Sequence, residues 1–328
     1  MSKNKISFII HCPSNSLSNG GAETLHQFAF HLKKNKFNVN VIYFPNENVN
    51  LPDNLLKYNI PITSFKDDYY NINIIPEVET SRTKIISKGK SVIYWLSVDG
   101  YFRRSLDAPF WKNWNYYRKT MRNRVFLFNL KKHAHLANSH YAQLFLKKKK
   151  IDSVEIKGYI SSFFDGKYDI STKKNIILYN PAKDRIHIKK IKDLFLNYKF
   201  IPLENVSKLK LKNLYSTSKI FLDFGTHPGR ERMPREAAIM GCVLLLARRG
   251  SVSNNIDVPI DDIYKININK INDLERLNYL IEDIFKNFDK HLSKFKDYIN
   301  LISFEKENEI FNNKVINFAN KTIEKTKF

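Results

Sequence analysis

Residues 223–246 read DFGTHPGRERMPREAAIMGCVLLL, and this stretch decides which fold the sequence predicts. The apolar run at 220–224 predicts a strand, which ends at a loop containing Gly225 and Gly229. A helix is predicted over 234–240, because proline is favoured in a first helical turn, where its missing N–H costs nothing. The apolar run at 243–247 predicts the next strand. A strand, a helix and a strand in this order are typical of a parallel sheet.

The same alternation of strand-length apolar runs and helix-period segments extends along the chain. A polar loop at 13–21 separates the first strand from a helix that starts near Ala22. The lysine-rich segment 167–175 has the composition of a linker, and the alternation starts again after it. Two long amphipathic segments, 271–298 and 304–325, are predicted helices. Further strands are expected at 6–10, 39–44, 91–96, 135–137, 176–179 and 200–203.

This order predicts an α/β fold with two Rossmann-like, doubly wound domains that face each other across a cleft. A chain of 328 residues is long enough for two domains. Residues 1–168 are the expected N-terminal domain and residues 169–300 the expected C-terminal domain. A C-terminal helix, 301–328, is expected to pack back towards the N-terminal domain.

The chain carries 55 basic and 32 acidic residues, a formal net charge of +23. Such an excess suits nucleic acid, an anionic membrane surface or a negatively charged substrate such as a nucleoside diphosphate. Frequent Lys, Asn and Ile, which all have A/T-rich codons, offer genome composition as a fourth explanation. The charge is therefore compatible with several functions and selects none of them.

Hydrophobic residues make up 43% of the chain, which excludes wholesale disorder. No uninterrupted apolar run approaches the ~20 residues that a membrane-spanning helix needs. The apolar run at 6–10 is too short for a signal peptide. Cys12 and Cys242 show neither paired nor metal-ligand spacing, which suits a reducing cytosol.

The loop and helix start at 225–236 have the chemistry of a phosphate site. Glycines let the backbone approach a ligand closely, and free amides at a helix start bind phosphate. Arg230, Arg232 and Arg235 add charge-assisted donors. Glu236 is expected in the first helical turn, where it faces the positive end of the dipole. An isolated glutamate at a helix start is usually no more than a partner of the dipole, but open α/β sheets bind ligands at the carboxyl ends of their strands, which favours a site here.

This stretch resembles the donor-site signature of retaining glycosyltransferase family 4, which has the GT-B fold, and indicates a divergent subgroup of bacterial surface-polysaccharide enzymes. Glu236, Ala237, Ala238, Gly241 and Val243 match the second half of the signature. The resemblance implies that Glu236 holds the ribose hydroxyls of a nucleotide. It also makes the intervening residues candidate donor contacts, namely Gly229, Arg230, Glu231, Arg232 and Met233.

The first half of the signature departs from the family. The family's first glutamate, which contacts the ring hydroxyls of the donor sugar, is expected at position 228, and the chain has Pro228 there. His227 or Glu231 could substitute for it, and His227 is taken as a catalytic candidate.

Two further segments match the family in the expected order. The run Gly20-Gly21-Ala22-Glu23 resembles a loop whose amides approach the donor phosphates, so Gly20, Gly21 and Glu23 are candidate donor contacts. After the strand at 176–179, relatives place a basic pair that neutralises the diphosphate leaving group. Lys183 and Arg185 are the candidates for that pair, and Lys183 is also a catalytic candidate.

Asp99 lies at a predicted strand end, where it could orient or deprotonate an acceptor hydroxyl, and Glu77 is similarly placed. Either could simply cap a turn. The histidines show no metal-ligand spacing and the chain has no Asp-x-Asp motif, so neither a metal nor another cofactor is expected beyond the nucleotide sugar itself.

The segment 101–133 mixes aromatic and basic residues, which suits a lipid interface, single-stranded nucleic acid, or a core helix with a solvated basic side. It contains Trp111, Trp114, Tyr116, Phe126, Phe128, Arg103, Arg104, Arg118, Arg122 and Arg124.

The sequence thus predicts an enzyme that transfers a sugar, with retention, from a nucleoside-diphosphate sugar to a hydroxyl of a lipid-linked bacterial surface glycan such as capsule or lipopolysaccharide. It is expected to work in the cytoplasm, peripherally at the inner face of the membrane, without nucleic acid as a partner. The alternatives are a nucleic-acid-binding protein and an inactive GT-B partner subunit. Generic salt-dependent DNA binding would favour the first alternative, and absence of nucleotide-sugar hydrolysis the second.

Overall fold

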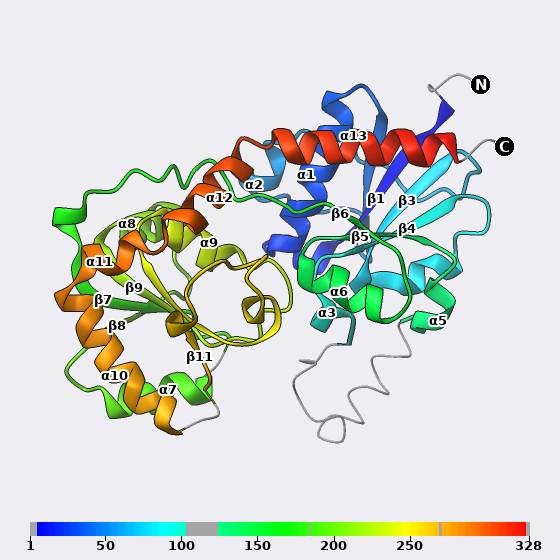
Figure 1. Cartoon of the computed structure of the whole chain (residues 1–328). Helices are drawn as coiled ribbons and strands as arrows, with labels where there is room; N and C mark the ends of the chain where they lie inside the picture. The colour runs from blue at the N-terminus through cyan, green and yellow to red at the C-terminus, as the bar shows by residue number, and fades with distance from the viewer. Residues whose placement is uncertain (1–4, 103–123, 184, 269–270, 326–328) are drawn as a thin grey trace. The chain divides into compact units, whose positions relative to one another are not determined.

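The computed structural model describes residues 5–102, 124–183, 185–268 and 271–325, without the side chains of 185–187, 190, 194 and 271–275. The chain divides into two compact units (Figure 1). The first comprises Met1–Gly158, Pro228–Arg230 and Asn308–Phe328, and the second comprises Tyr159–His227 and Glu231–Glu307. Each unit is an α/β structure built on its own parallel sheet.

The first unit contains a six-stranded sheet of order β2-β1-β3-β4-β5-β6. All of its strand pairs are parallel. The strands are β1 (Ser7–Pro13), β2 (Asn38–Phe44), β3 (Asn71–Pro76), β4 (Lys90–Trp95), β5 (Ala134–Ala137) and β6 (Val154–Glu155). The helices are η2 (Ser14–Ser16), α1 (Gly20–Lys34), α2 (Asp53–Leu56), η3 (Glu77–Lys84), α3 (Val98–Phe102), α5 (Leu127–Leu130), α6 (His140–Lys148) and α13 (Glu309–Glu324).

The second unit contains a five-stranded parallel sheet of order β11-β10-β9-β7-β8. Its strands are β7 (Lys174–Tyr179), β8 (Lys199–Pro202), β9 (Ser218–Asp223), β10 (Val243–Ala247) and β11 (Lys265–Ile266). Its helices are η5 (Ile170–Thr172), α7 (Arg185–Leu194), α8 (Lys208–Thr217), α9 (Arg232–Ile239), η6 (Gly250–Ser253), η7 (Asp262–Tyr264), α10 (Ile271–Lys286), α11 (Phe288–Ser293) and α12 (Lys296–Lys306).

Strand β10 shows why these sequences form buried parallel strands. All five of its residues are buried, as expected of a strand covered on both faces. It lies between β9 and β11, and its side chains belong to a core that also includes residues of α9 and α10. The unbroken apolar run at 243–247 is therefore explained by burial on both sides.

The end of the chain differs from the two long helices expected at 271–298 and 304–325. The first segment is interrupted at Asn287, which has non-helical angles of φ −118° and ψ 45°. Asn308, at φ 53°, adopts the left-handed conformation that asparagine tolerates, and it separates α12 from α13. Helix α13 packs on α1 within the first unit, where Asn312 Oδ1 accepts a hydrogen bond from Asn35 Nδ2 at 2.7 Å.

The segment 167–175, expected as a linker, is an integral part of the second unit. Lys173 is buried, and its ammonium donates hydrogen bonds to the carbonyl oxygens of Tyr215 (2.7 Å), Ser218 (3.1 Å) and Met240 (2.8 Å). Tyr168 packs so closely on Gly241 that a Cβ there would lie 2.5 Å from the ring. Earlier in the chain, Phe164 also joins this core, and the unit begins at Tyr159, whereas the predicted boundary lay after residue 168.

Candidate functional site

In each sheet the strand order reverses at one point, and the loops that follow the two strands at that point run to opposite sides. In the second unit the chain leaves β7 towards β8 on one side and then crosses to β9 on the other. Open α/β sheets bind ligands at such a switch point, outside the carboxyl ends of the strands. The loops that start at Asn180 and Phe224 therefore flank the expected binding position of the second unit.

A charged cluster occupies this switch point. The Lys183 ammonium donates a hydrogen bond to Glu231 Oε2 and lies 3.7 Å from Asp223 Oδ2. Burial alone would lower the pKa of Lys183, but the Asp223 and Glu231 carboxylates raise it overall. Burial alone would raise the pKa of Asp223, but Lys183, His227 and the Gly225 N–H lower it overall. The lysine and the aspartate are thus held in their charged forms.

The loop backbone is arranged around these side chains. Gly225 N donates to Asp223 Oδ1 at 2.9 Å, and a Cβ on Gly225 would lie 2.8 Å from Lys183 Cδ. The absence of a side chain at this position allows Lys183 to cross the loop. Asp223 was not among the sequence-predicted site residues, although its place at the last position of β9 was the signal that could have identified it.

His227 is buried beneath the loop. Its Nε2 lies 3.1 Å from the Asp223 carbonyl oxygen and 3.9 Å from Asp223 Oδ1. Burial lowers its pKa, so the ring is neutral at neutral pH and Nε2–H donates to that carbonyl. The backbone of His227 is left-handed, with φ 47°, a conformation in which histidine is enriched. The structure therefore gives His227 a part in shaping the turn, while its predicted contact to a donor sugar stays a prediction.

Helix α9 begins at Arg232, two residues before the expected start. Pro234 is accommodated because the first N–H groups of a helix have no intrahelical partner. Glu236 consequently lies beyond the first turn, which contains no acidic residue, and its expected pairing with the positive end of the dipole is wrong. The Glu236 carboxylate is buried, with Oε1 3.5 Å from Arg232 Nε.

Of the other predicted donor contacts of this unit, Met233 lies next to the loop that follows β7. Met233 Sδ is 3.3 Å from Asn180 Nδ2, which connects α9 to the loop after β7. Arg235 is buried and turned inwards, with Nε donating to the Glu231 carbonyl at 3.3 Å. Arg185 begins α7, but its side chain lies outside the described residues.

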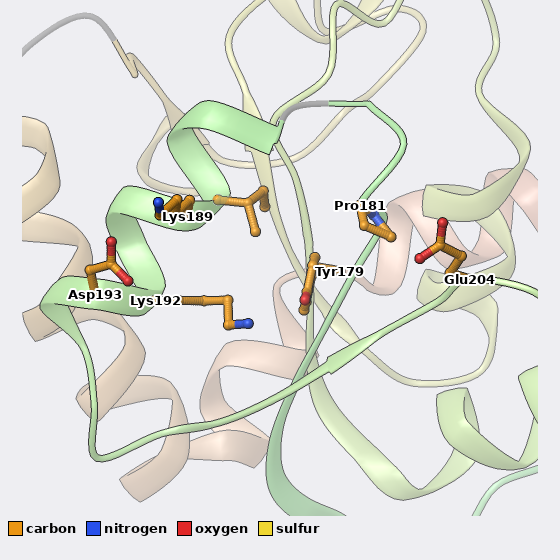
Figure 2. Close-up of a pocket in the computed structure, with 7 residues that line it drawn as sticks. Tyr179, Pro181, Lys189, Lys192, Asp193 and Glu204 are labelled. Carbon is orange, nitrogen blue, oxygen red and sulfur yellow. The ribbon is translucent and has the colours of Figure 1, made fainter.

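A cavity of about 230 Å³ opens beside this switch point (Figure 2). Tyr179, the last residue of β7, contributes to its wall, and the Lys192 ammonium lies 5.6 Å from the centroid of the Tyr179 ring. Charged side chains of both signs surround the cavity, and Tyr179, Pro181 and Ile188 give it apolar surface, a combination that suits a flat, polar ring. It is lined by Tyr179, Pro181, Ile188, Lys189, Lys192, Asp193 and Glu204.

In the first unit, α1 begins at Gly20, so both predicted glycines lie in its first turn. Asn19, at the N-cap, forms no side-chain capping bond to the helix. The first amides of a helix lack intrahelical acceptors, which leaves them suited to an anion. Glu23 turns inwards instead: its carboxylate is buried, with Oε1 3.7 Å from Lys57 Nζ.

Glu77 and Asp99 follow neighbouring strands of the first sheet. The Glu77 carboxylate is buried and accepts hydrogen bonds from Leu96 N at 2.8 Å and Ser97 N at 3.1 Å. Burial raises the pKa of Glu77 to about 7, against the effect of those N–H donors. Glu77 thus orders the turn after β4, and Asp99 is buried on α3 directly beyond that turn.

The short segment Pro228–Arg230 belongs to the first unit by its contacts. The Pro228 carbonyl accepts from Val98 N at 3.1 Å, and Gly229 forms an antiparallel bridge with Ser97. A Cβ on Gly229 would lie 2.3 Å from the Leu96 carbonyl oxygen, so only glycine allows this approach. Arg230 Nη1 lies 3.5 Å from the Gly158 carbonyl.

Two negative findings apply to the described residues. They contain no group of three or more His, Cys, Asp or Glu side chains that could hold a metal ion. None of their helices is long and apolar enough to cross a membrane. Most of the aromatic and basic segment at 101–133 falls within 103–123, which lies outside the described residues.

No protein-family model and no curated protein sequence matches the chain. Solved structures do match it. A sucrose-phosphate synthase from Thermosynechococcus elongatus aligns with a TM-score of 0.67 over 97% of this chain and 99% of that chain, at 9% identity. A trehalose-6-phosphate protein from E. coli, bound with UDP-2-fluoro glucose, aligns with a TM-score of 0.57 over 98% and 99%, also at 9% identity.

The chain has the GT-B fold. Its two parallel-sheet α/β units match those of these structures, and the predicted fold class is confirmed. An alpha-glucosyltransferase in complex with UDP supports the same conclusion, with a TM-score of 0.55 over 93% of this chain and 99% of that chain, at 10% identity. At such identities the likeness extends to the fold and leaves the substrates of this GT-B protein open.

Proposed function

We propose that this protein is a glycosyltransferase that moves a sugar from a nucleoside diphosphate to a hydroxyl group. The observation that carries the proposal is the cluster at the β7/β9 switch point, where Asp223 and Glu231 hold Lys183 as a cation and Glu231 leads directly into α9, the helix that carries Glu236. A fold shared with proteins bound to UDP or a UDP sugar supports the nucleotide as ligand.

In this proposal the second unit binds the nucleotide. Lys183 exchanges its Glu231 partner for diphosphate oxygens, and Arg232 adds a second cation. Glu236 accepts hydrogen bonds from the ribose hydroxyls, and the cavity beside Tyr179 takes the base, whose polar ring suits the mixed charges of the walls.

The reaction breaks the bond between the anomeric carbon and the diphosphate oxygen, and the electron pair leaves with the diphosphate. The acceptor oxygen forms the new bond to the same carbon, and its proton passes to the departing phosphate. Lys183 opposes the negative charge that develops on the leaving group, which lowers the barrier electrostatically. This route retains the anomeric configuration and requires no separate carboxylate pair.

A nucleotide panel tests the donor site. UDP, GDP, dTDP and CMP are added to the purified chain, and the unfolding temperature is measured. One nucleoside diphosphate is expected to raise it, by an amount that grows with concentration, because only the folded state binds it. Glu236→Ala should abolish the rise and Glu236→Gln should reduce it.

The matched control is Glu324→Ala, which removes an exposed carboxylate at the end of α13 and should leave the rise unchanged. Both Glu236 variants must unfold cooperatively without ligand. No stabilisation of the unaltered chain by any of the four nucleotides would refute the donor site.

The proposed acceptor is a lipid-linked glycan of a bacterial surface, reached from the cytoplasmic face of a membrane. Phe126, the N-cap of α5, is exposed by 59%, Phe128 within the helix is exposed by 80%, and Lys131 and Lys132 follow them. Exposed rings next to cations suit an anionic lipid surface.

Co-sedimentation with vesicles tests this placement. The protein is expected to sediment with phosphatidylglycerol vesicles at low salt, and Phe126→Ser with Phe128→Ser should reduce the bound fraction several-fold. The paired control is Tyr279→Ser, an exposed ring on α10 of the second unit. Equal binding of both variants would contradict a role for α5.

A further inference from the structure

Arg82 occupies the switch point of the first unit. The chain leaves β1 towards β2 on one side and crosses to β3 on the other, so this sheet also has a ligand position at the carboxyl ends of β1 and β3. Arg82 lies on η3, the helix that directly follows β3. No sequence motif singled out Arg82, and the proposed donor chemistry does not use it.

A chain of hydrogen bonds between buried polar groups holds the guanidinium of Arg82. Arg82 Nε donates to His11 Nδ1 at 2.7 Å, and His11 Nε2 lies 3.0 Å from Asn73 Oδ1. Burial lowers the pKa of His11 to about 3, so the ring is neutral and its Nδ1 lone pair accepts from the arginine. The proton then lies on Nε2 and is donated to Asn73.

Two aromatic rings fix the plane of the same group. The guanidinium carbon lies 4.3 Å from the centroid of Phe44, at the end of β2, and 5.3 Å from that of Phe65. A stacked, hydrogen-bonded arginine has little freedom left to lose when it binds a ligand.

The edge of the Arg82 guanidinium that faces away from His11 is available to a ligand. In the described part of the chain, the bond to His11 Nδ1 is the sole hydrogen bond of the Arg82 guanidinium, and no ion pair forms between it and a carboxylate. Burial lowers the pKa of this half-buried group, and Glu79 and Glu47 oppose that effect from beyond ion-pair distance. The guanidinium stays charged, and its planar donors match the oxygens of a phosphate.

We propose that Arg82 binds a phosphate group carried by the acceptor substrate, so that this protein glycosylates a phosphorylated acceptor. The identification of the ligand as an acceptor substrate rests on the proposed function. The presence of an anion site at Arg82 does not depend on it. His11 and Asn73 are positioning residues that aim the guanidinium, and Arg82 is the specificity-determining contact.

The Arg82 Nε–H, held by His11, gives a direct readout in ¹H–¹⁵N spectra of arginine side chains. Its signal is assigned as the one that is lost in Arg82→Lys. Inorganic phosphate is then titrated into the full-length protein. The signal is expected to shift and saturate, and Arg82→Gln should weaken phosphate binding, measured by calorimetry, by about tenfold or more because two charge-assisted hydrogen bonds are lost.

Two short-chain lipids distinguish a lipid phosphodiester from a free phosphate. A shift with dihexanoyl phosphatidylglycerol but not with inorganic phosphate supports the site and assigns it to a lipid-borne group. Dihexanoyl phosphatidylcholine is the zwitterionic control. If the assigned signal moves with none of these probes, or if phosphate binds Arg82→Gln as tightly as the unaltered chain, the proposal is overturned.

Matched variants separate this result from the donor site. Arg248→Gln removes an exposed arginine of the second unit, paired with Asp262 at 3.0 Å, and should leave phosphate binding intact. Arg82→Gln should keep the stabilisation by a nucleoside diphosphate, and Glu236→Ala should keep the phosphate-induced shift. Loss of one response without the other shows which of the two proposals has failed.

Discussion

Lys183→Met is expected to lower the turnover number of sugar transfer on the order of 10²- to 10³-fold, the usual effect of removing one group that stabilises developing negative charge. Lys183 is held as a cation by Asp223 and Glu231 at the β7/β9 switch point. Diphosphate departure places charge where this ammonium lies, so the loss should appear mainly in turnover rather than in nucleoside affinity.

The binding measurement makes this prediction specific. Lys183→Met should weaken binding of a nucleoside diphosphate while leaving the affinity for the nucleoside alone nearly unchanged, since the nucleoside carries no phosphate. Lys174→Met is the matched control, because Lys174 is exposed and begins β7 on the same unit. Equal loss of nucleoside and diphosphate binding would point to a structural role instead.

Removing Lys183 also leaves Asp223 buried without its cation, which destabilises the fold by itself. The double variant Lys183→Met with Asp223→Asn removes both charges and should recover much of that stability. Its turnover should remain low. Recovery of activity together with stability would mean that the Lys183 ammonium is not needed for the chemistry.

Lys173→Met is expected to lower the free energy of unfolding of the second unit by roughly 2–4 kcal/mol, because three buried carbonyl oxygens lose their ammonium donor and two of them keep only the weak thiol donor of Cys242. Two of these carbonyls, on Tyr215 and Met240, belong to the last turns of α8 and α9, where a cation is also favoured by the helix dipole. Methionine keeps most of the length of the side chain but donates no hydrogen bond.

Urea unfolding followed by circular dichroism measures the effect. Lys174→Met changes the adjacent, exposed lysine and should shift stability by less than about 0.5 kcal/mol. Trp95, buried in the core of the first unit, gives a fluorescence signal from that unit, which should change less than the dichroism signal. If Lys173→Met and Lys174→Met have the same free energy of unfolding, the buried Lys173 ammonium makes no net contribution to stability.

The hydrophobic pattern of the sequence was sufficient to predict strands that are buried along their whole length. The run at 243–247 was correctly predicted as a strand, which the structure shows to be buried throughout, and the order of such runs predicted two parallel sheets. Strand β3 was missed because Asn71 and Asn73 interrupt its apolar pattern. Asn73 is nevertheless buried, with its amide satisfied by His11 and the Lys90 carbonyl.

For the candidate site, the sequence by itself determined which residue types gather at strand ends: glycines, Lys183, Glu231 and Glu236. Only the tertiary structure decided which of them meet, since Lys183 and Asp223 are forty positions apart and are paired by the adjacency of β7 and β9. The same holds for Lys173, which reads as a linker residue and is a buried cation. Contacts between distant segments depend on strand order, and local composition does not encode that order.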